Sequence, residues 1–157
     1  MTTPLDVMQI RTHQFGRVDP VSNTFGLVRQ HGHRPHQGWD LQAGVGTSVK
    51  AVADGFLFAG PESKDYGVTL ILQFNANGQT LYAFYAHLKE VSISVPCSVA
   101  EGTVIARSGR SGNASSIPTK EAHLHFEIRT APQLGKGLGG RIDPGEVLGY
   151  QYYTCPF

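Results

Sequence analysis

The sequence has few of the features that would place a protein in a specialised class. Its 157 residues include two cysteines, Cys97 and Cys155, which are too few and too far apart for a zinc knuckle and could form one disulfide or be two free thiols. No apolar run approaches the roughly 20 residues of a membrane-spanning helix, and the first six residues do not begin a signal peptide. Neither positive nor negative charge predominates, because 13 basic and 12 acidic residues leave a net charge of +1. This balance favours neither nucleic acid nor an anionic membrane surface as a partner.

Long helical patterns are also lacking, whereas turn-forming residues are plentiful. Nineteen glycines and nine prolines are spread along the chain, which suits many short strands joined by tight turns. Asn77-Gly78 is a strong hairpin signal between two apolar segments. Only residues 144–150 could form a helix longer than a turn or two. Apolar and alternating patterns predict strands over residues 24–29, 38–42, 48–52, 55–59, 68–74, 80–87, 99–106 and 123–128.

These patterns predict one domain with a mainly β fold. With 40% apolar and 16% charged residues, a chain of this length is ordinary for a single globular core. Residues 1–21 carry no periodic pattern and are expected to form an irregular lead-in, while residues 22–157 form the domain itself. Residues 108–120, rich in glycine, serine and asparagine, are expected to be a long loop that walls a groove. The expected architecture is antiparallel sheet with short strands, long groove-forming loops and little helix.

The stretch from His123 to Ile128 carries the clearest functional signal. Polar and apolar residues alternate there without a break, as in a half-buried strand, so His123, His125 and Glu127 should project from one face. Two neighbouring imidazoles repel each other when protonated, but neutral imidazole is a good ligand for Zn²⁺ and a strand fixes its direction. This strand therefore predicts a metal site.

Two other stretches supply further candidate residues. His36 stands four residues before Asp40, a spacing that brings both side chains to the same side of an extended chain or of one helical turn. An aromatic-rich strand pattern between the two stretches ends in His87. Two histidines and one aspartate would leave a fourth position for water, which is the composition of a catalytic rather than a structural zinc site. By contrast, His31 and His33 lie in a Gly/Pro stretch and are interpreted as loop residues.

In their order and rough spacing, these stretches resemble the lysostaphin-like, or LytM-type, zinc metallopeptidases. The likeness covers roughly Phe25 to Tyr150, nearly the whole chain. One His-x-His pair alone would be weak evidence, but the three stretches together are specific. The resembling segments are residues 36–40, 49–55, 85–88, 101–106, 108–109, 123–127 and 142–144.

The resemblance implies a role for each of the candidate residues. His36, Asp40 and His125 are similar to the ligands of one zinc ion per chain. His87 and His123 are similar to the pair that activates the attacking water and stabilises the tetrahedral intermediate. Zinc would lower the pKa of its bound water from 15.7 to about 7 and polarise the carbonyl, and imidazole would exchange the proton near neutral pH. His123 is preferred as the general base, although the sequence does not order the two.

The same resemblance implies a substrate and a place of action. Members are mostly peptidoglycan hydrolases that cut peptide bonds in the stem or the cross-bridge, so the expected function is that of a zinc-dependent peptidoglycan endopeptidase. The D-Ala to meso-diaminopimelate cross-link is favoured over pentaglycine because no separate wall-targeting domain accompanies this chain. We expect a monomer that acts in the periplasm or at the bacterial cell wall. Without a signal peptide, it would be exported by phage lysis or effector secretion, or its leader is missing.

Several alternatives stay open at this point. The chain could be a non-catalytic module that binds peptidoglycan or activates another hydrolase, or a zinc hydrolase of a different amide or ester. Glu127 could orient a ligand as a hydrogen-bond acceptor, but an ordinary cross-strand partner is the preferred interpretation. Core packing is likewise preferred to a groove for four aromatic residues, Trp39, Tyr66, Tyr82 and Phe84.

Overall fold

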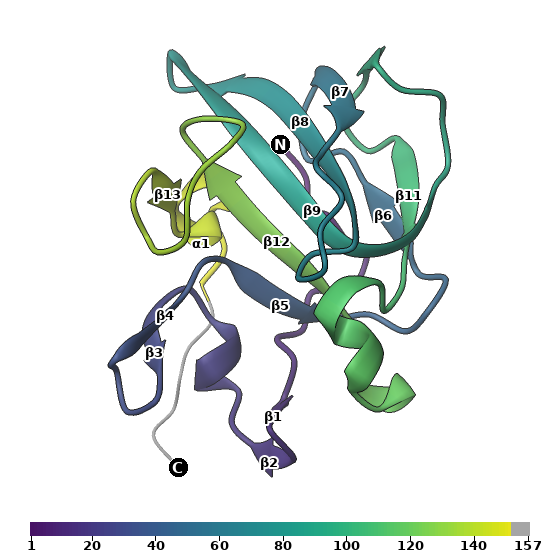
Figure 1. Cartoon of the computed structure of the whole chain (residues 1–157). Coiled ribbons are helices and arrows are strands. Elements are labelled where there is room, and N and C mark those ends of the chain that lie inside the picture. The colour runs from purple at the N-terminus through teal and green to yellow at the C-terminus, as the bar shows by residue number, and fades with distance from the viewer. Residues whose placement is uncertain (152–157) are drawn as a thin grey trace.

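The computed structural model describes residues 1–151 as a β structure with one short α-helix (Figure 1). All the strand pairs of the described residues are antiparallel. The main sheet has nine strands, whose central path runs β10, β7, β8, β9, β11, β6. Strand β12 joins this path at β9 and carries β5 and β13 on its other edge. The mainly β, antiparallel fold expected from the sequence is confirmed.

A strand forms in each of the predicted segments, whereas β1, β2, β4, β10 and β13 were not predicted. The strands are β1 (His13–Gln14), β2 (Arg17–Val18), β3 (Gly26–Arg29), β4 (Arg34–His36), β5 (Trp39–Gln42), β6 (Ser48–Lys50), β7 (Gly55–Ala59), β8 (Val68–Ala76), β9 (Gln79–Val91), β10 (Cys97–Val99), β11 (Val104–Ser108), β12 (His123–Arg129) and β13 (Arg141–Ile142). The helical segments are the 3₁₀ turns η1 (Val21–Asn23), η2 (Gly112–Ser116) and η3 (Thr119–Glu121), and the α-helix α1 (Pro144–Leu148).

The hairpin of β8 and β9 forms at the predicted turn. Asn77 and Gly78 have positive φ angles of 51° and 75° and separate the paired residues Ala76 and Gln79. A two-residue turn of this kind requires left-handed backbone at both positions, which asparagine tolerates and glycine adopts without a steric penalty. The register of the two longest strands therefore follows from the turn.

Strand β9 changes its partner along its length. Residues 82–86 pair with β12, whereas residues 88–91 pair with β11. His87 lies at the change and has a φ of 58°, a left-handed conformation that costs a residue with a Cβ atom roughly 1–2 kcal/mol. The backbone turn ends the simple alternation of the strand. Tyr85 and Leu88 both enter the core, while the ring of His87 lies on the opposite face beside the ring of His123.

Strand β12 separates the core from the candidate site. All of its residues are buried. Leu124, Phe126 and Ile128 belong to the main hydrophobic core, whereas the rings of His123 and His125 face away from it toward His87. The alternation read from the sequence is therefore confirmed, and it supplies one apolar and one polar face to a single strand.

Residues 1–21 are more ordered than the irregular lead-in expected from the sequence. Strands β1 and β2 form a two-stranded hairpin, and Ile10 forms an isolated bridge with Leu41 of β5. The main-chain N–H of Arg11 donates to the carbonyl oxygen of Asp40 at 2.9 Å. This segment therefore extends the sheet beside β5. Local periodicity could not reveal it, because a single bridge has no pattern of its own.

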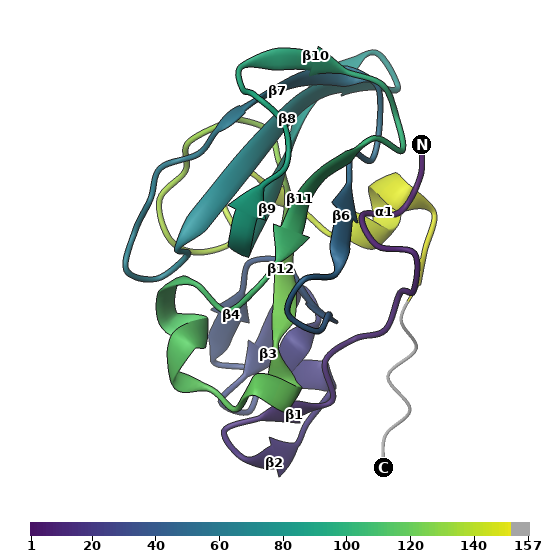
Figure 2. The same ribbon diagram turned by 90° about the vertical axis from the view of Figure 1, so that its right-hand side faces the viewer.

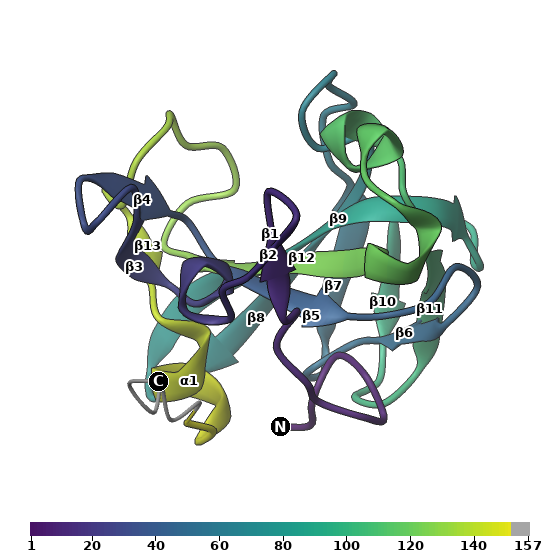
Figure 3. The same ribbon diagram turned by 90° about the horizontal axis from the view of Figure 1, so that it is seen from below.

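The loops and short elements gather around β12. Residues 108–120 contain η2 and the start of η3, which leads directly to His123. Seen from below, these turns lie on one side of β12, while β3, β4 and the loop before β13 lie on the other (Figure 3). The β1–β2 hairpin lies at the same end of the molecule as the start of β12 (Figure 2).

Helix α1 is the one α-helix among the described residues, and local contacts define both of its ends. The Asp143 side chain accepts a hydrogen bond from the N–H of Gly145 at 3.0 Å, and Gly149 ends the helix with a φ of 68°. It lies within the segment predicted to be helical. No helix of the described residues is long and apolar enough to cross a membrane. Cys155 lies outside the described residues, so the alternatives for Cys97 stay as the sequence leaves them.

Candidate metal centre

Two histidines and one aspartate meet where β4, β5 and β12 come together. His36 is the last residue of β4, and Asp40 of β5 pairs directly with His125 of β12. Oδ1 of Asp40 lies 3.2 Å from Nε2 of His36 and 2.8 Å from Nδ1 of His125. All three side chains are buried, and their candidate ligand atoms lie within 4.8 Å of one another. Gly38 permits this approach, because a Cβ atom there would clash with the main-chain carbonyl of Phe126.

The spacing and orientation of these atoms fit a tetrahedral metal ion. Zinc bonds of about 2.0–2.2 Å to nitrogen and oxygen place neighbouring ligand atoms roughly 3.3 Å apart. Nδ1 of His36 donates to the carbonyl oxygen of Thr24 at 2.8 Å, which leaves Nε2 free to bind a metal. Nε2 of His125 bonds to Oε1 of Glu127 at 2.8 Å, which directs Nδ1 toward Asp40. A hydrogen bond from the outer nitrogen is what fixes the tautomer and the ring orientation of a metal-binding histidine.

Glu127 connects His125 to two arginines inside the protein. Its Oε2 atom accepts hydrogen bonds from Nε of Arg129 at 2.6 Å and from Nε of Arg141 at 2.8 Å. Burial raises the pKa of Glu127, but the contacts with His125 and Arg129 outweigh burial and hold the pKa below its ordinary value. The buried carboxylate is therefore ionised and paired on both oxygens. The interpretation of Glu127 as an ordinary cross-strand partner is wrong, because its side chain is bonded to a candidate ligand.

His87 and His123 face the same centre from two strands. Nδ1 of His87 donates to the carbonyl oxygen of Ser111 at 2.8 Å, and Nδ1 of His123 lies 3.2 Å from the carbonyl oxygen of Glu121. The two ring centroids are 5.1 Å apart, and Nε2 of His123 lies 3.8 Å from Oδ1 of Asp40. Since a carbonyl oxygen can only accept, each Nδ1 keeps its proton and each Nε2 carries a lone pair.

Both of these histidines are neutral at neutral pH. Burial is the main cause, and together with the neighbouring His123 and His125 it lowers the pKa of His87 to about 3. Burial also lowers the pKa of His123, which the nearby Asp40 only partly offsets. A neutral imidazole with an open Nε2 can accept a proton from a group held beside it.

All five candidate residues therefore lie in one centre, and the two histidines interpreted as loop residues do not. His31 and His33 are exposed in the turn between β3 and β4. The loop interpretation of that pair is confirmed.

The comparisons with known proteins agree with this geometry. The sequence model described as Peptidase family M23 matches residues 34–144, which include every candidate residue of the centre. The chain belongs to peptidase family M23. Within the family, the M23 domain is 34% identical over 112 residues to the DD-carboxypeptidase/endopeptidase Mpg of Neisseria meningitidis, which covers 69% of this chain and 24% of that protein. The chain spans about a quarter of the length of the curated relatives it matches.

Two solved structures of M23 proteins are similar to this one over most of its length. The catalytic domain of the antimicrobial peptidase lysostaphin from Staphylococcus simulans is 25% identical, with a TM-score of 0.63, and the match covers 81% of this chain and 90% of that one. LytU is 30% identical, with a TM-score of 0.63, and the match covers 85% of this chain and 87% of that one. The resemblance to lysostaphin-like peptidases is therefore confirmed.

Two further side chains of this M23 domain support the centre: Tyr66, which sequence patterns placed in the core, and Gln37, which no sequence pattern singled out. The ring of Tyr66, expected in the core, lies 5.7 Å from the ring of His125, and the Tyr66 carbonyl accepts from the His87 N–H at 2.9 Å. Its hydroxyl contacts the Gln37 side-chain amide, and Oε1 of Gln37 accepts from the N–H of Gly137 at 2.7 Å. Trp39 and Phe84 are buried, as core packing predicts.

Arg29 binds the oxygen of Asp40 that faces away from the histidines. Its Nη2 atom lies 3.0 Å from Oδ2 of Asp40, and its Nε atom donates to the carbonyl oxygen of Ser22 at 2.9 Å. Burial raises the pKa of Asp40, but the surrounding histidines outweigh burial and hold the pKa well below its ordinary value. Asp40 is therefore an ionised carboxylate with one oxygen held by an arginine and the other directed at the centre. Residues 25–29 show no hydrophobic periodicity that would have identified Arg29 as a partner of Asp40.

Zinc binding is expected to weaken as the pH falls. Burial lowers the pKa of His125, but its hydrogen bonds to Asp40 and Glu127 outweigh burial and raise the pKa to about 9 in the metal-free protein. Nδ1 must lose that proton before it can bind a metal, so proton and metal compete below about pH 9. We expect the apparent zinc affinity to fall about tenfold for each unit of pH below that value. Calorimetric titration in buffers of different ionisation enthalpy measures both the affinity and the released proton, and a pH-independent affinity would contradict the expectation.

Proposed function

We propose that this M23 domain is a zinc-dependent endopeptidase of peptidoglycan, with His36, Asp40 and His125 as the ligands of one zinc ion. The observation that carries the proposal is the orientation of the imidazoles. Two of them direct a nitrogen at Asp40 while the other nitrogen is hydrogen-bonded. A third, His123, places its Nε2 3.8 Å from the same carboxylate, and the ring of His87 lies beside those of His123 and His125. A structural site would need only the ligands, so the additional pair supports catalysis.

The chemistry divides between the metal and the two further histidines. Zinc bound by the three ligands would supply a Lewis acid for the scissile carbonyl and a water of lowered pKa. His123 accepts the proton of the attacking water on Nε2, since this atom lies 3.8 Å from Oδ1 of Asp40, the oxygen directed at the centre. The resulting imidazolium donates the proton to the leaving amine. The ring of His87 lies 5.1 Å from that of His123, and its Nε2, left open by the hydrogen bond of Nδ1 to Ser111, would be a second proton acceptor beside the reacting bond.

We further propose the D-Ala to meso-diaminopimelate cross-link as the bond that is cut, in the periplasm or at the cell wall. The relative from Neisseria meningitidis is named a DD-carboxypeptidase/endopeptidase, which supports a bond between two D-configured centres. Lysostaphin is named an antimicrobial peptidase, which supports an action on bacteria without specifying this bond.

The proposal is tested by mass spectrometry of purified peptidoglycan digested with and without a zinc chelator. Walls with each of the two cross-link types are used as parallel substrates. We expect new peptide ends at D-Ala that disappear with the chelator and return when zinc is added. If zinc is bound and neither wall releases peptides, the domain is a non-catalytic module or acts on another substrate.

A further inference from the structure

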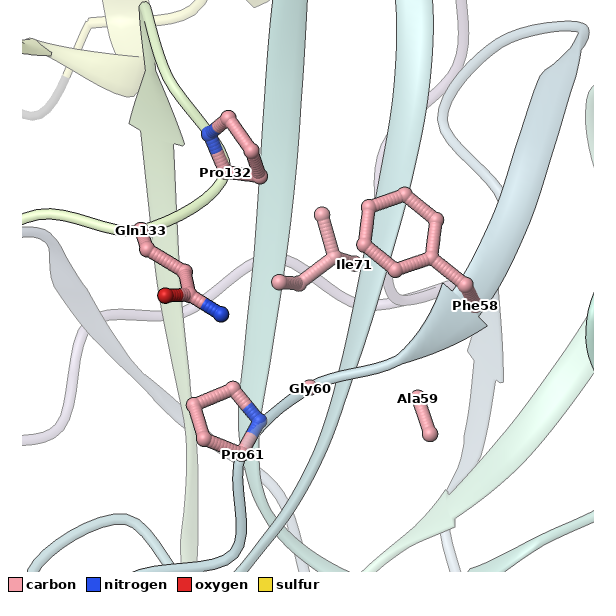
Figure 4. Close-up of a pocket in the computed structure, with 7 residues that line it drawn as sticks. All are labelled: Phe58, Ala59, Gly60, Pro61, Ile71, Pro132 and Gln133. Atoms are coloured by element: carbon pink, nitrogen blue, oxygen red, sulfur yellow. The ribbon is translucent and has the colours of Figure 1, made fainter.

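A pocket of about 510 Å³ lies against strands β7 and β8, away from the metal centre (Figure 4). Phe58 and Ile71 line it from the sheet, and Pro132 lines it from the loop after β12. Ile71 and its partner Phe84 on β9 are buried, and the guanidinium of Arg129 lies 3.7 Å from the centroid of the Phe84 ring. These side chains close the sheet surface between the pocket and the centre, so the pocket has no part in the proposed chemistry.

Arg11, by contrast, is a buried cation beside the centre, and the proposed chemistry leaves it without a role. Its main-chain N–H bonds to the carbonyl oxygen of Asp40, so it lies directly next to a candidate ligand. The β1–β2 hairpin that follows Arg11 lies at the same end of the molecule as the start of β12, where His123 lies (Figure 2). Arg11 also precedes residues 34–144, which the family model matches, so it is a feature of the N-terminal segment of this chain.

The side chain of Arg11 joins the N-terminal segment to η3. Its Nη2 atom lies 3.4 Å from Oε1 of Glu121, and its Nη1 atom donates to Oε1 of Gln14 at 3.0 Å. The two side chains of the ion pair are only 5% and 10% exposed. The carbonyl oxygen of Arg11 accepts from Nδ2 of Asn23 at 2.7 Å, so its main chain is fixed as well. Arg11 is thus held at both ends, and Glu121 is held through it.

Glu121 in turn orients His123, which follows it by two residues. Its carbonyl oxygen lies 3.2 Å from Nδ1 of His123, and its main-chain N–H donates to the carbonyl oxygen of Pro118 at 2.9 Å. Because a carbonyl oxygen can only accept, this contact keeps the proton of the neutral imidazole on Nδ1 and the lone pair on Nε2. The tautomer that a general base requires therefore depends on the direction of the Glu121 carbonyl. The ion pair with Arg11 holds the residue that carries this carbonyl.

The ion pair is poorly suited to a purely stabilising role. A buried pair adds stability only where its geometry is excellent and its remaining polar groups are hydrogen-bonded. Here the distance of 3.4 Å between Nη2 of Arg11 and Oε1 of Glu121 exceeds the length of about 2.7–2.9 Å that is typical of strong charge-assisted hydrogen bonds. In addition, Nε of Arg11 is buried without a hydrogen-bond partner among the described residues. The pair is better explained by the position that it gives to Glu121.

Given the peptidoglycan endopeptidase activity proposed above, we propose that Arg11 is a positioning residue of the proton-transfer step, which holds Glu121 so that its carbonyl keeps Nε2 of His123 open. Its guanidinium acts through Glu121 and not on the substrate. Without this carbonyl, the neutral imidazole can carry its proton on Nε2, where it cannot accept the proton of the attacking water. The N-terminal segment is thereby part of the active site.

The test first follows turnover in variants of the pair. Arg11→Met keeps much of the length of the side chain and removes its charge. We expect it to lower kcat on a cross-linked muropeptide about 10–100-fold, the usual loss on removal of a group that orients an active-site histidine, with KM and zinc content unchanged. Arg11→Lys keeps a cation beside Glu121 and should lose less than about tenfold. Arg17→Met is the matched control, because Arg17 is exposed in β2 of the same segment, and it should equal the wild type.

The tautomer of His123 is read from the nitrogen NMR chemical shifts of its imidazole, with and without added zinc. The wild type and Arg17→Met should carry the proton on Nδ1, whereas Arg11→Met should show a measurable fraction with the proton on Nε2. Glu121→Gln keeps the shape of the acid and removes its charge, so it should shift the tautomer in the same direction. It takes the place of Arg11→Met if that variant does not fold.

The two readouts separate the positioning role from the proposed function. A wild-type tautomer in whichever of Arg11→Met and Glu121→Gln folds would overturn the positioning role. An unchanged kcat despite a shifted tautomer would overturn it too, as would an equal loss of kcat in Arg17→Met. If the tautomer shifts but the wild type cleaves no peptidoglycan, the positioning of His123 stands and the endopeptidase activity is rejected.

Discussion

Asp40→Ala is expected to abolish stoichiometric zinc binding. Among residues 1–151, Asp40 is the one carboxylate that touches both candidate histidine ligands, at 3.2 Å from His36 and 2.8 Å from His125. Its removal would leave Arg29 without an anionic partner beside a dication, so the lost ligand and the added repulsion act in the same direction. Zinc content after dialysis, measured by mass spectrometry of the metal, should fall from about one ion per chain to near zero.

His36→Ala should give the same result, and His33→Ala is its matched control. Both histidines belong to the β3–β4 hairpin region, but His36 is buried at the centre and His33 is exposed in the turn. The His33 variant should keep its zinc. Tight binding of one zinc ion by either the Asp40 or the His36 variant would contradict the assignment of the ligands.

His123→Ala and His87→Ala are expected to keep zinc and lose turnover. Neither residue is among the three whose ligand atoms converge, so the metal should remain. Each contributes an open Nε2 that accepts or returns a proton, and removal of a general acid or base costs on the order of 10²–10⁴-fold in rate. The measurements are kcat on a cross-linked muropeptide and zinc content of the same sample. Wild-type turnover in either variant would show that its proton transfer is not used.

His87→Gly separates the chemistry of this residue from its backbone conformation. At a φ of 58°, glycine avoids the steric cost that histidine and alanine bear. The glycine variant should therefore be more stable than the alanine variant by about 1 kcal/mol, as measured by denaturant unfolding. Both should be equally inactive, because both lack the imidazole. A glycine variant that regained turnover would assign the effect of His87→Ala to strain.

The left-handed backbone of His87 lowers the stability of the sheet but brings this residue to the centre. A left-handed histidine inside a strand is unfavourable, and it persists because the residues on both sides are fixed by different partner strands. The main-chain N–H of His87 is held by the carbonyl of Tyr66, and its carbonyl by the N–H of Gly109. The change of partner along β9 thus directs one more imidazole at the centre.

The sequence by itself determined the elements that depend on local pattern. The alternation over His123 to Ile128 placed two imidazoles on one face, and Asn77-Gly78 located the longest hairpin, because side-chain direction in a strand and left-handed turns are properties of neighbouring residues. The spacing of His36 and Asp40 brought those side chains together for the same reason.

Only the tertiary structure decided the residues whose role depends on long-range pairing. Simple alternation from Leu81 through Tyr85 would direct His87 into the core, and the partner change of β9 reverses it. Glu127 acquired its role from Arg141, which lies 14 residues later in β13 and reaches Oε2 only through the pairing of β13 with β12. Local periodicity records the direction of a side chain along its own strand. Which strand lies beside it, and where that pairing breaks, depends on contacts between residues that are distant in the chain.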